Sequence, residues 1–152
     1  MKRCLLCHSL LTESPLLGDL FGFRQPKDSA CQKCLAPFTL LSQTGCIRCY
    51  KEGSDAICSD CIAWETRGEI ICHTSIYRYN DAMSDFFEAY KFQGDYLLKG
   101  VFQSVLKKYL KSYKDWTIVP VPVSQFRYDE RGFSQVAAML ESAEIPYRNL
   151  LR

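Results

Sequence analysis

The pattern of hydrophobic and polar positions predicts two short strands after Arg67-Gly68. Residues 69–79 are rich in Ile, Tyr and Thr, which is typical of a strand. Residues 117–123 form an apolar run that contains Pro120 and Pro122. Because proline cannot donate to a strand ladder, this run predicts a buried strand that stops at its carboxyl end.

A helical period appears between and after these runs. Asn80-Asp81 can cap a helix that ends near Gly94, and Asp95 can cap a second helix over 97–110. A third helix is predicted between Ser134 and Pro146. The order of strand, helices, strand and helix predicts an α/β fold that begins a parallel sheet, in which ligands bind at the carboxyl ends of the strands.

The first half of the chain is distinguished by cysteine instead of by periodicity. Eight of the nine cysteines form four Cys-x-x-Cys pairs. The pairs are Cys4/Cys7, Cys31/Cys34, Cys46/Cys49 and Cys58/Cys61. Two such pairs complete a tetrahedral thiolate site, so the sequence predicts about two zinc ions per chain. A set of unrelated core or redox thiols is the less favoured interpretation.

The spacing favours one grouping of these pairs. The shortest connection joins Cys46/Cys49 to Cys58/Cys61, which is enough for a hairpin as in zinc ribbons, and leaves Cys4/Cys7 with Cys31/Cys34. An interleaved arrangement stays open. The ninth cysteine, Cys72, is expected to be a small buried apolar residue. The apolar residues of 8–30 are expected to cover the metal knuckles and to offer a surface to a partner.

Composition changes after Arg67-Gly68, so we expect a zinc-binding module over 1–67 and a second domain over 68–152. The length of 152 residues suits one domain or two small ones. No apolar run approaches the ~20 residues of a membrane span, and the start has no export signal, so a cytoplasmic protein is expected. The formal net charge of +2 gives no general reason for nucleic-acid binding; only a local patch could.

Two local patterns indicate binding chemistry. In the first, Arg127, Arg131 and Gln135 lie around a predicted strand end and helix start, where guanidinium and backbone N–H groups suit phosphate. A solvated loop is an equally good interpretation. In the second, no acidic residue interrupts residues 99–114. This stretch carries Lys99, Lys107, Lys108, Lys111 and Lys114, interleaved with Tyr109 and Tyr113.

Lysines beside ring faces can hold a single nucleic-acid strand without reading its sequence. The alternative is a solvated helix face whose cations favour the helix C-terminus. We expect Lys107, Lys108, Lys111 and Lys114 to be the residues that contact the strand.

Several motifs occur together in a recognisable order. The four cysteine pairs are followed by Tyr90-Lys91-Phe92, by Val119-Pro120-Val121-Pro122 and by Arg131-Gly132-Phe133-Ser134-Gln135. In this order they resemble the ComF family, competence proteins of the ComFC type with a zinc finger ahead of a type I phosphoribosyltransferase-like domain. Ser134 stands where the family pattern usually has Asn.

The resemblance implies an adaptor in natural transformation, which works with a ComFA helicase-like ATPase in cytoplasmic uptake of single-stranded DNA. The alternative that it implies is phosphoribosyl transfer, with Arg127 and Arg131 on the pyrophosphate and Lys91 assisting. The family's acidic pair and Thr-Thr-Gly-like loop do not occur before Arg152. The sequence therefore resembles the front two-thirds of a family member, and an incomplete sheet is expected to favour self-association.

Overall fold

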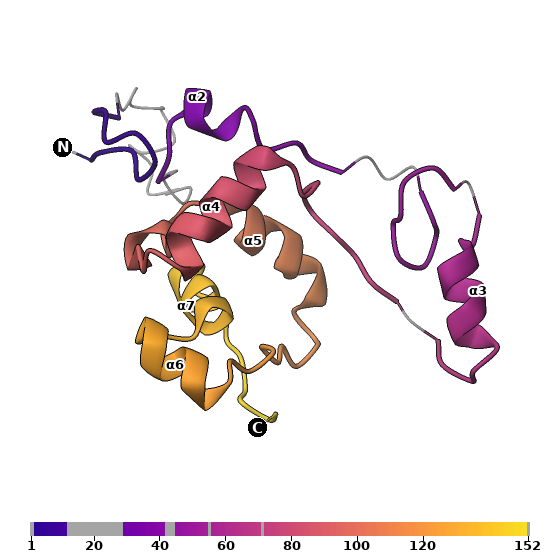
Figure 1. Ribbon diagram of the computed structural model, residues 1–152. Helices are drawn as coiled ribbons and strands as arrows, with labels where there is room; N and C mark the ends of the chain where they lie inside the picture. The colour runs from indigo at the N-terminus through magenta and orange to yellow at the C-terminus, as the bar shows by residue number, and fades with distance from the viewer. Residues whose placement is uncertain (1, 12–28, 42–44, 55, 71, 152) are drawn as a thin grey trace. The chain divides into compact units, whose positions relative to one another are not determined.

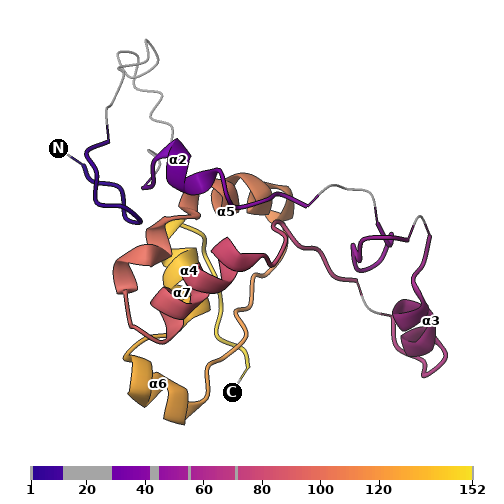
Figure 2. The same ribbon diagram turned by 45° about the horizontal axis from the view of Figure 1, so that its top comes forward.

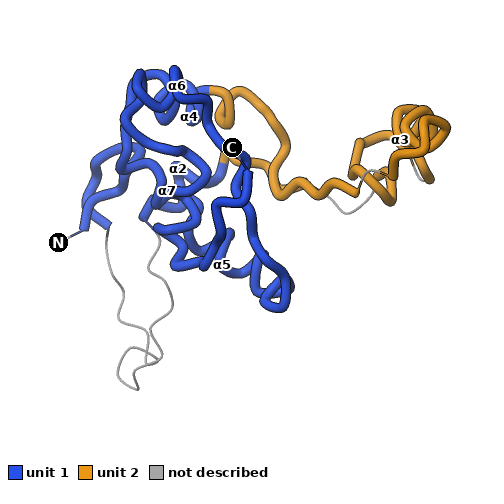
Figure 3. The backbone as a smooth tube through the Cα atoms, turned by 90° about the horizontal axis from the view of Figure 1, so that it is seen from below, with its two compact units in different colours: residues 1–36, 85–152 blue, residues 37–84 orange. Residues whose placement is uncertain are grey.

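The computed structural model describes residues 2–11, 29–41, 45–54, 56–70 and 72–151 (Figure 1). The chain divides into two compact units, one of residues 1–36 with 85–152 and one of residues 37–84 (Figure 3). Neither limit coincides with the expected boundary after Arg67. The first two cysteine pairs group with the C-terminal helices, and the last two form a unit of their own. We call these the helical unit and the small unit. The predicted apolar cover of 8–30 falls mostly on residues outside the described ranges.

The regular elements of the described residues are helices (Figures 1 and 2). The elements are α2 (Gln32–Leu35), α3 (Ser59–Glu65), α4 (Asp81–Lys91), η1 (Tyr96–Gly100), α5 (Gln103–Leu110), η2 (Lys111–Tyr113), α6 (Gln125–Arg131) and α7 (Gln135–Ser142). Helix α7 packs against η1 and against α5. None of the helices in the described ranges combines the length and the hydrophobicity that crossing a bilayer requires.

Aromatic side chains form the core of the helical unit. Tyr90 on α4 is completely buried, and Phe86 one turn earlier packs edge-to-face on Phe102 at a centroid distance of 4.8 Å. The Tyr90 hydroxyl donates to the carbonyl oxygen of Gln135 at 2.8 Å. Because the carbonyl lies in the first turn of α7, this bond joins α4 to α7 in the interior.

The helix predictions are confirmed in outline. The Oδ1 atom of Asn80 accepts from the backbone N–H of Met83 at 3.1 Å, as expected of a cap for α4. Asp95 likewise accepts from Leu97 N–H and begins the next element. The helix expected over 97–110 is divided into η1 and α5. Gly100 lies at the division, and a side chain there would approach the Ser29 hydroxyl to 3.3 Å. Glycine therefore permits a close packing contact at a point where it weakens the helix.

The predicted parallel sheet is not supported. Within the described ranges, β pairing is limited to two isolated antiparallel bridges, Arg3 with Leu10 and Leu40 with Tyr77. Residues 117–123 form no β ladder. Ile118 accepts one backbone bond from Arg148, at 2.9 Å, and Val121 is 72% exposed. Two prolines in this run supply no N–H donors, which limits pairing. The described residues therefore offer no sheet edge for the expected self-association, which stays a prediction.

The segment expected to be a loop at a strand end is helix α6. Its first turn is capped by the Ser124 hydroxyl, which accepts from the N–H of Arg127 at 3.4 Å. Gly132 ends the helix with a φ of +79°, and its N–H donates to the carbonyl of Tyr128 at 2.7 Å. A glycine suits this position because a left-handed backbone is strained for residues with a Cβ. Phe126 is 73% exposed, so the helix lacks the buried stripe that would have indicated it.

Candidate metal centres and binding surfaces

Two groups of four thiols come together in the structure. The first contains Cys4, Cys7, Cys31 and Cys34, and the second contains Cys46, Cys49, Cys58 and Cys61. This is the sequential grouping that the spacing favoured, and all nine cysteines are free of disulfides. Within each group every Sγ lies within 4.8 Å of the others.

The sulfur separations suit a tetrahedral zinc ion. A Zn–S bond of about 2.3 Å in tetrahedral geometry separates two sulfurs by about 3.8 Å. In the first centre the Sγ atoms of Cys7 and Cys31 are 3.8 Å apart. In the second the Cys46–Cys61 and Cys49–Cys58 separations are 3.8 and 3.6 Å. The donor set and its geometry therefore fit zinc in both centres.

The first cysteine pair of each centre lies in the same kind of loop. The carbonyl of Cys4 accepts from the N–H of His8 at 2.9 Å, and the carbonyl of Cys46 accepts from Tyr50 at 2.8 Å. His8 and Tyr50 both adopt a left-handed backbone, with φ of 57° and 60°. Each chain reversal thus turns two sulfurs toward one point. The two centres are local structural repeats, which the sequence analysis did not identify.

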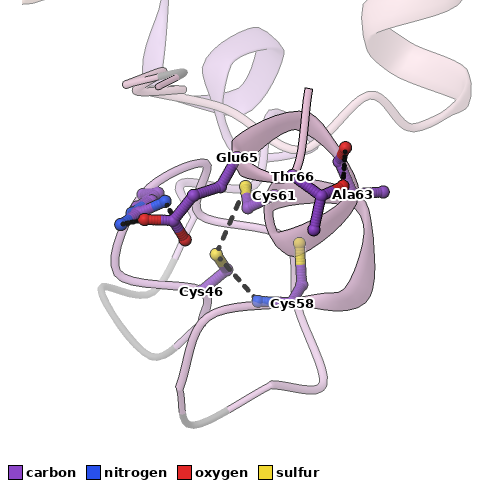
Figure 4. Close-up of polar contacts among 7 residues, drawn as sticks. Cys46, Cys58, Cys61, Ala63, Glu65 and Thr66 are labelled. Atoms are coloured by element: carbon purple, nitrogen blue, oxygen red, sulfur yellow. Dashed lines mark hydrogen bonds and ion pairs between the residues drawn. The ribbon is translucent and has the colours of Figure 1, made fainter. Parts of the chain in front are cut away.

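The second cysteine pair of each centre lies at the start of a helix. Cys31 is the N-cap of α2, and Cys58 is the N-cap of α3. The N–H of Cys31 donates to the Cys4 sulfur at 3.3 Å, and that of Cys58 donates to the Cys46 sulfur at 3.3 Å (Figure 4). The described residues between Cys49 and Cys58 form no strand pair, so the expected ribbon-like hairpin is not supported. A helix start supplies the second pair because its free N–H groups stabilise thiolate.

Two exposed ion pairs join the loop of the second centre to α3. Arg48 pairs with Glu65 at 3.0 Å, and Lys51 pairs with Asp60 at 2.6 Å. Exposed pairs of this kind contribute about 0–1 kcal/mol each. They therefore add little stability, and we expect the stability of so small a unit to depend mainly on a bound metal.

The two centres differ in exposure. Cys7 is exposed, and Cys31 and Cys34 are partly exposed. In the second centre Cys46, Cys58 and Cys61 are all buried. Cys72 is exposed and belongs to neither centre, so the expectation that it is buried is wrong.

Thiol pKa values diverge within each centre. A hydrogen bond from the Ser9 side chain lowers the pKa of Cys7 to about 6, and the Cys58 N–H lowers that of Cys46 to about 6. Burial, together with the neighbouring thiols, raises the pKa of Cys34 to about 12 and raises that of Cys61. Crowded thiolates repel one another, and a divalent cation removes that repulsion. Metal binding at either centre is therefore expected to release protons.

The predicted lysines converge on a single cavity of the helical unit. Its volume is about 780 Å³, and Lys107, Lys108, Lys111 and Lys114 all line it. We call this cavity the basic groove. Its aromatic lining consists of Tyr113 and Trp116, and its one acidic residue is Glu144. Lys107 pairs with Glu144 at 2.5 Å. Among the described residues, the other three lysines form no ion pair.

A second cavity of the helical unit, about 660 Å³ in volume, lies where α6 meets α7. Arg131, Ser134 and Glu141 are among its lining residues. The Arg131 guanidinium lies over the Phe92 ring at 5.2 Å, and its Nε is buried without a hydrogen-bond partner in the described part of the chain. Such an unsatisfied donor suits an anionic ligand. We call this the arginine cavity.

Comparison with known proteins finds two curated relatives, both named competence protein ComFC. The protein from Streptococcus pneumoniae is 38% identical over 149 residues, which cover 98% of this chain and 68% of the relative. This chain belongs to the ComFC family. The ComFC protein of Bacillus subtilis is 31% identical over 151 residues, which cover 94% of this chain and 62% of that relative. No protein-family model and no solved structure matches the chain.

Four residues were expected to bind phosphate, namely Lys91, Arg127, Arg131 and Gln135, and only Arg131 lines the arginine cavity. Arg127 pairs with Glu130 at 2.6 Å on the surface of α6. Lys91 lies over the Phe87 ring at 4.1 Å, and burial lowers its pKa. Gln135 is buried, and its side chain donates to the Phe133 carbonyl at 3.4 Å. The structure therefore does not bring the four residues together on the cavity.

One nucleic-acid candidate also lies elsewhere. The Lys99 ammonium lies over the Tyr96 ring at 3.8 Å, and Lys99 does not line the basic groove. Trp116 is the groove residue that the sequence analysis missed. An aromatic residue two positions after the last lysine of a basic stretch is a signal that could have indicated it.

Proposed function

We propose that this chain acts in natural transformation and binds incoming single-stranded DNA in the basic groove. The observation that carries the proposal is the convergence of four lysines on one cavity with a single acidic residue. Lys108, Lys111 and Lys114 are exposed and available to phosphates. Ammonium groups bind the backbone of any sequence, as a protein that handles DNA of arbitrary origin requires.

The groove works, in this proposal, in the cytoplasm. Two tetrathiolate centres need reduced cysteines, and all nine cysteines of the structure are free thiols. A reducing compartment keeps such thiols available to metal.

The partner in the proposal is a ComFA-like helicase ATPase. The small unit exposes Ile47 by 71%, Ile62 by 50% and Ile70 by 69%. Exposed isoleucines on a module held together by a metal centre favour a protein contact. Capture of the purified ATPase by the full chain tests this, with Ile47→Lys and Ile70→Lys expected to lose capture. Leu97→Lys, which changes an equally exposed residue of the helical unit, is the control. Unchanged capture by both isoleucine variants would contradict the partner assignment.

A competence role is tested in a naturally transformable host that lacks its own ComFC protein and expresses this chain. Replacing Lys108, Lys111 and Lys114 by Gln should lower the transformation frequency at equal protein level, because DNA would be held less tightly. The control variant replaces Lys2 and Lys33 by Gln, because both are exposed like the groove lysines and neither lines the groove. If the groove variant transforms as well as the parent chain, the groove has no part in transformation.

A second candidate function is phosphoribosyl transfer, and the unpartnered Nε of Arg131 is the observation that favours it. In this reading the arginine cavity binds the pyrophosphate group of phosphoribosyl pyrophosphate. Calorimetric titration with that compound tests binding, and Arg131→Gln should abolish it. Arg127→Gln, which changes an arginine outside the cavity, should not.

A further inference from the structure

We infer that the basic groove distinguishes unpaired from paired bases, and that Trp116 does so by stacking on a base. This inference rests on the proposed binding of single-stranded DNA and adds a stacking contact with a base to the phosphate contacts of the lysines. The lysines contact phosphates, which single and double strands share. A ring can stack on a base only where that base is not already paired and stacked within a duplex.

Trp116 is held in place while its ring stays accessible. Its backbone N–H donates to the carbonyl of Tyr113 at 2.9 Å, which closes the turn after η2. The Tyr113 and Trp116 rings meet edge-to-face at 6.3 Å and 72°. The Tyr113 ring in turn packs on Tyr109 at 5.8 Å, and Tyr109 belongs to α5. A chain of rings thus braces the indole against α5, yet Trp116 remains 73% exposed.

Trp116 lies on the same cavity as the lysines that would bind the phosphates. The indole lines the same cavity as Lys111 and Lys114, with Ile118 and Pro146 also on its wall. A phosphate held by these lysines places the attached base within the cavity, where apolar and aromatic surface is available to it. Four lysines against one glutamate favour a polyanion over a protein segment as the occupant.

The experiment measures affinity of the full chain for two ligands of equal length, an oligothymidylate and an abasic sugar-phosphate oligomer. Trp116→Leu should weaken oligothymidylate binding by roughly 5- to 150-fold, the range that loss of one stacked base produces. It should change abasic binding by less than about twofold. Trp116→Phe should retain most of the affinity because it keeps an aromatic face. Phe126→Leu alters an equally exposed ring outside the groove and should change neither affinity.

Fluorescence gives a second readout. The chain has two tryptophans, so Trp64→Phe leaves Trp116 as the only indole. Its emission should be quenched by oligothymidylate and much less by the abasic oligomer or by duplex DNA.

The outcomes separate the two proposals. If Trp116→Leu binds oligothymidylate as the parent does, or loses both ligands equally, stacking by Trp116 is wrong. In either case DNA binding by the groove stands as long as replacing Lys108, Lys111 and Lys114 by Gln weakens both ligands. If the parent chain binds neither oligomer, the proposed function fails, and the inference about Trp116 fails with it.

Discussion

The side-chain amide of Gln103 donates a hydrogen bond to the hydroxyl of Ser29 at 2.9 Å. Gln103 is the first residue of α5, and Ser29 lies two residues before the metal-centre residue Cys31. The Ser29 carbonyl also accepts from the N–H of Leu5, at 2.9 Å, in the first knuckle of that centre. The first metal centre and α5 therefore share a hydrogen-bonded junction. Because α5 carries part of the basic groove, the metal should support the groove.

Loss of the first centre should therefore destabilise the groove, and loss of the second should not. In a Trp64→Phe background, the single indole of Trp116 reports on the helical unit. Cys34→Ser should lower the Tm measured by this signal by about 4–8 °C or more, since a loss of about 1 kcal/mol of stability produces a shift of that size. Cys61→Ser, the matched change in the second centre, should leave that Tm nearly unchanged. Equal shifts from both variants would show that the junction has no special role.

Metal content should follow the grouping of the thiols. We expect about two zinc ions per chain, and Cys34→Ser or Cys61→Ser should each remove about one. Cys72→Ser should leave the count at two, since Cys72 lies in neither centre. Elemental analysis of the purified chain measures this directly. One zinc ion in the unaltered protein would be incompatible with two complete centres.

The cysteine centres were predictable because the metal ligands come in pairs that lie two residues apart in the sequence. Cys46/Cys49 and Cys58/Cys61 are separated by so few residues that a shared ion was the simplest arrangement. The lysines of the basic groove were predictable for a similar reason, since they are close in sequence and on consecutive turns. The basic groove itself was not predictable, because its other wall comes from Glu144 and Pro146, which lie far from the lysines in the sequence.

The parallel sheet was a wrong prediction because strand propensity is not strand pairing. Residues 117–123 have the apolar composition of a strand, yet pairing depends on distant segments that composition does not show. Helix α6 was missed for the opposite reason. Its caps, Ser124 and Gly132, are clear in the sequence, but its exposed Phe126 broke the expected apolar stripe. Cap residues at both ends are thus the better signal for a short surface helix.

Tyr90 should be a main determinant of stability in the helical unit. Tyr90→Phe removes the buried hydrogen bond to the Gln135 carbonyl and keeps the aromatic ring. The free energy of unfolding should fall by about 0.5–1.5 kcal/mol in urea titrations, the usual net contribution of one hydrogen bond. Tyr128→Phe, which changes a tyrosine that is 45% exposed, is the control and should have little effect. A fall of similar size in both variants would contradict the special role of the buried bond.

The buried hydroxyl group of Tyr90 also predicts that the stability of the helical unit depends on pH. Burial raises the pKa of Tyr90 above its usual value of about 10. The folded chain therefore retains this proton at pH values where the unfolded chain has lost it. Its contribution to stability is complete below about pH 10 and is lost as the pH rises further. Above about pH 10 the midpoint urea concentration of unfolding should fall, and it should fall less in Tyr90→Phe. An equal fall in the variant would show that other groups cause it.

Glu144 should lower the affinity of the basic groove for DNA. Its pairing with Lys107 keeps one ammonium from phosphate and lowers the pKa of the carboxyl group. Glu144→Gln should raise the affinity for single-stranded DNA and steepen the salt dependence by about 0.7 in log affinity against log salt. Glu130→Gln frees Arg127 outside the groove and should change neither quantity. Weaker binding by Glu144→Gln would mean that the ion pair shapes the groove instead of restraining it.

The most direct test of the account is a salt titration of oligonucleotide binding by two variants. One replaces Lys108, Lys111 and Lys114 by Gln, and the other replaces Arg127 and Arg131 by Gln. Each phosphate-contacting lysine contributes about 0.7 to the slope on single strands, so the lysine variant should bind more weakly, with a slope smaller by roughly 2. The arginine variant should keep the parent's slope. If the lysine variant binds as the parent does while the arginine variant loses binding, the DNA lies over α6, and the assignment of the basic groove is wrong.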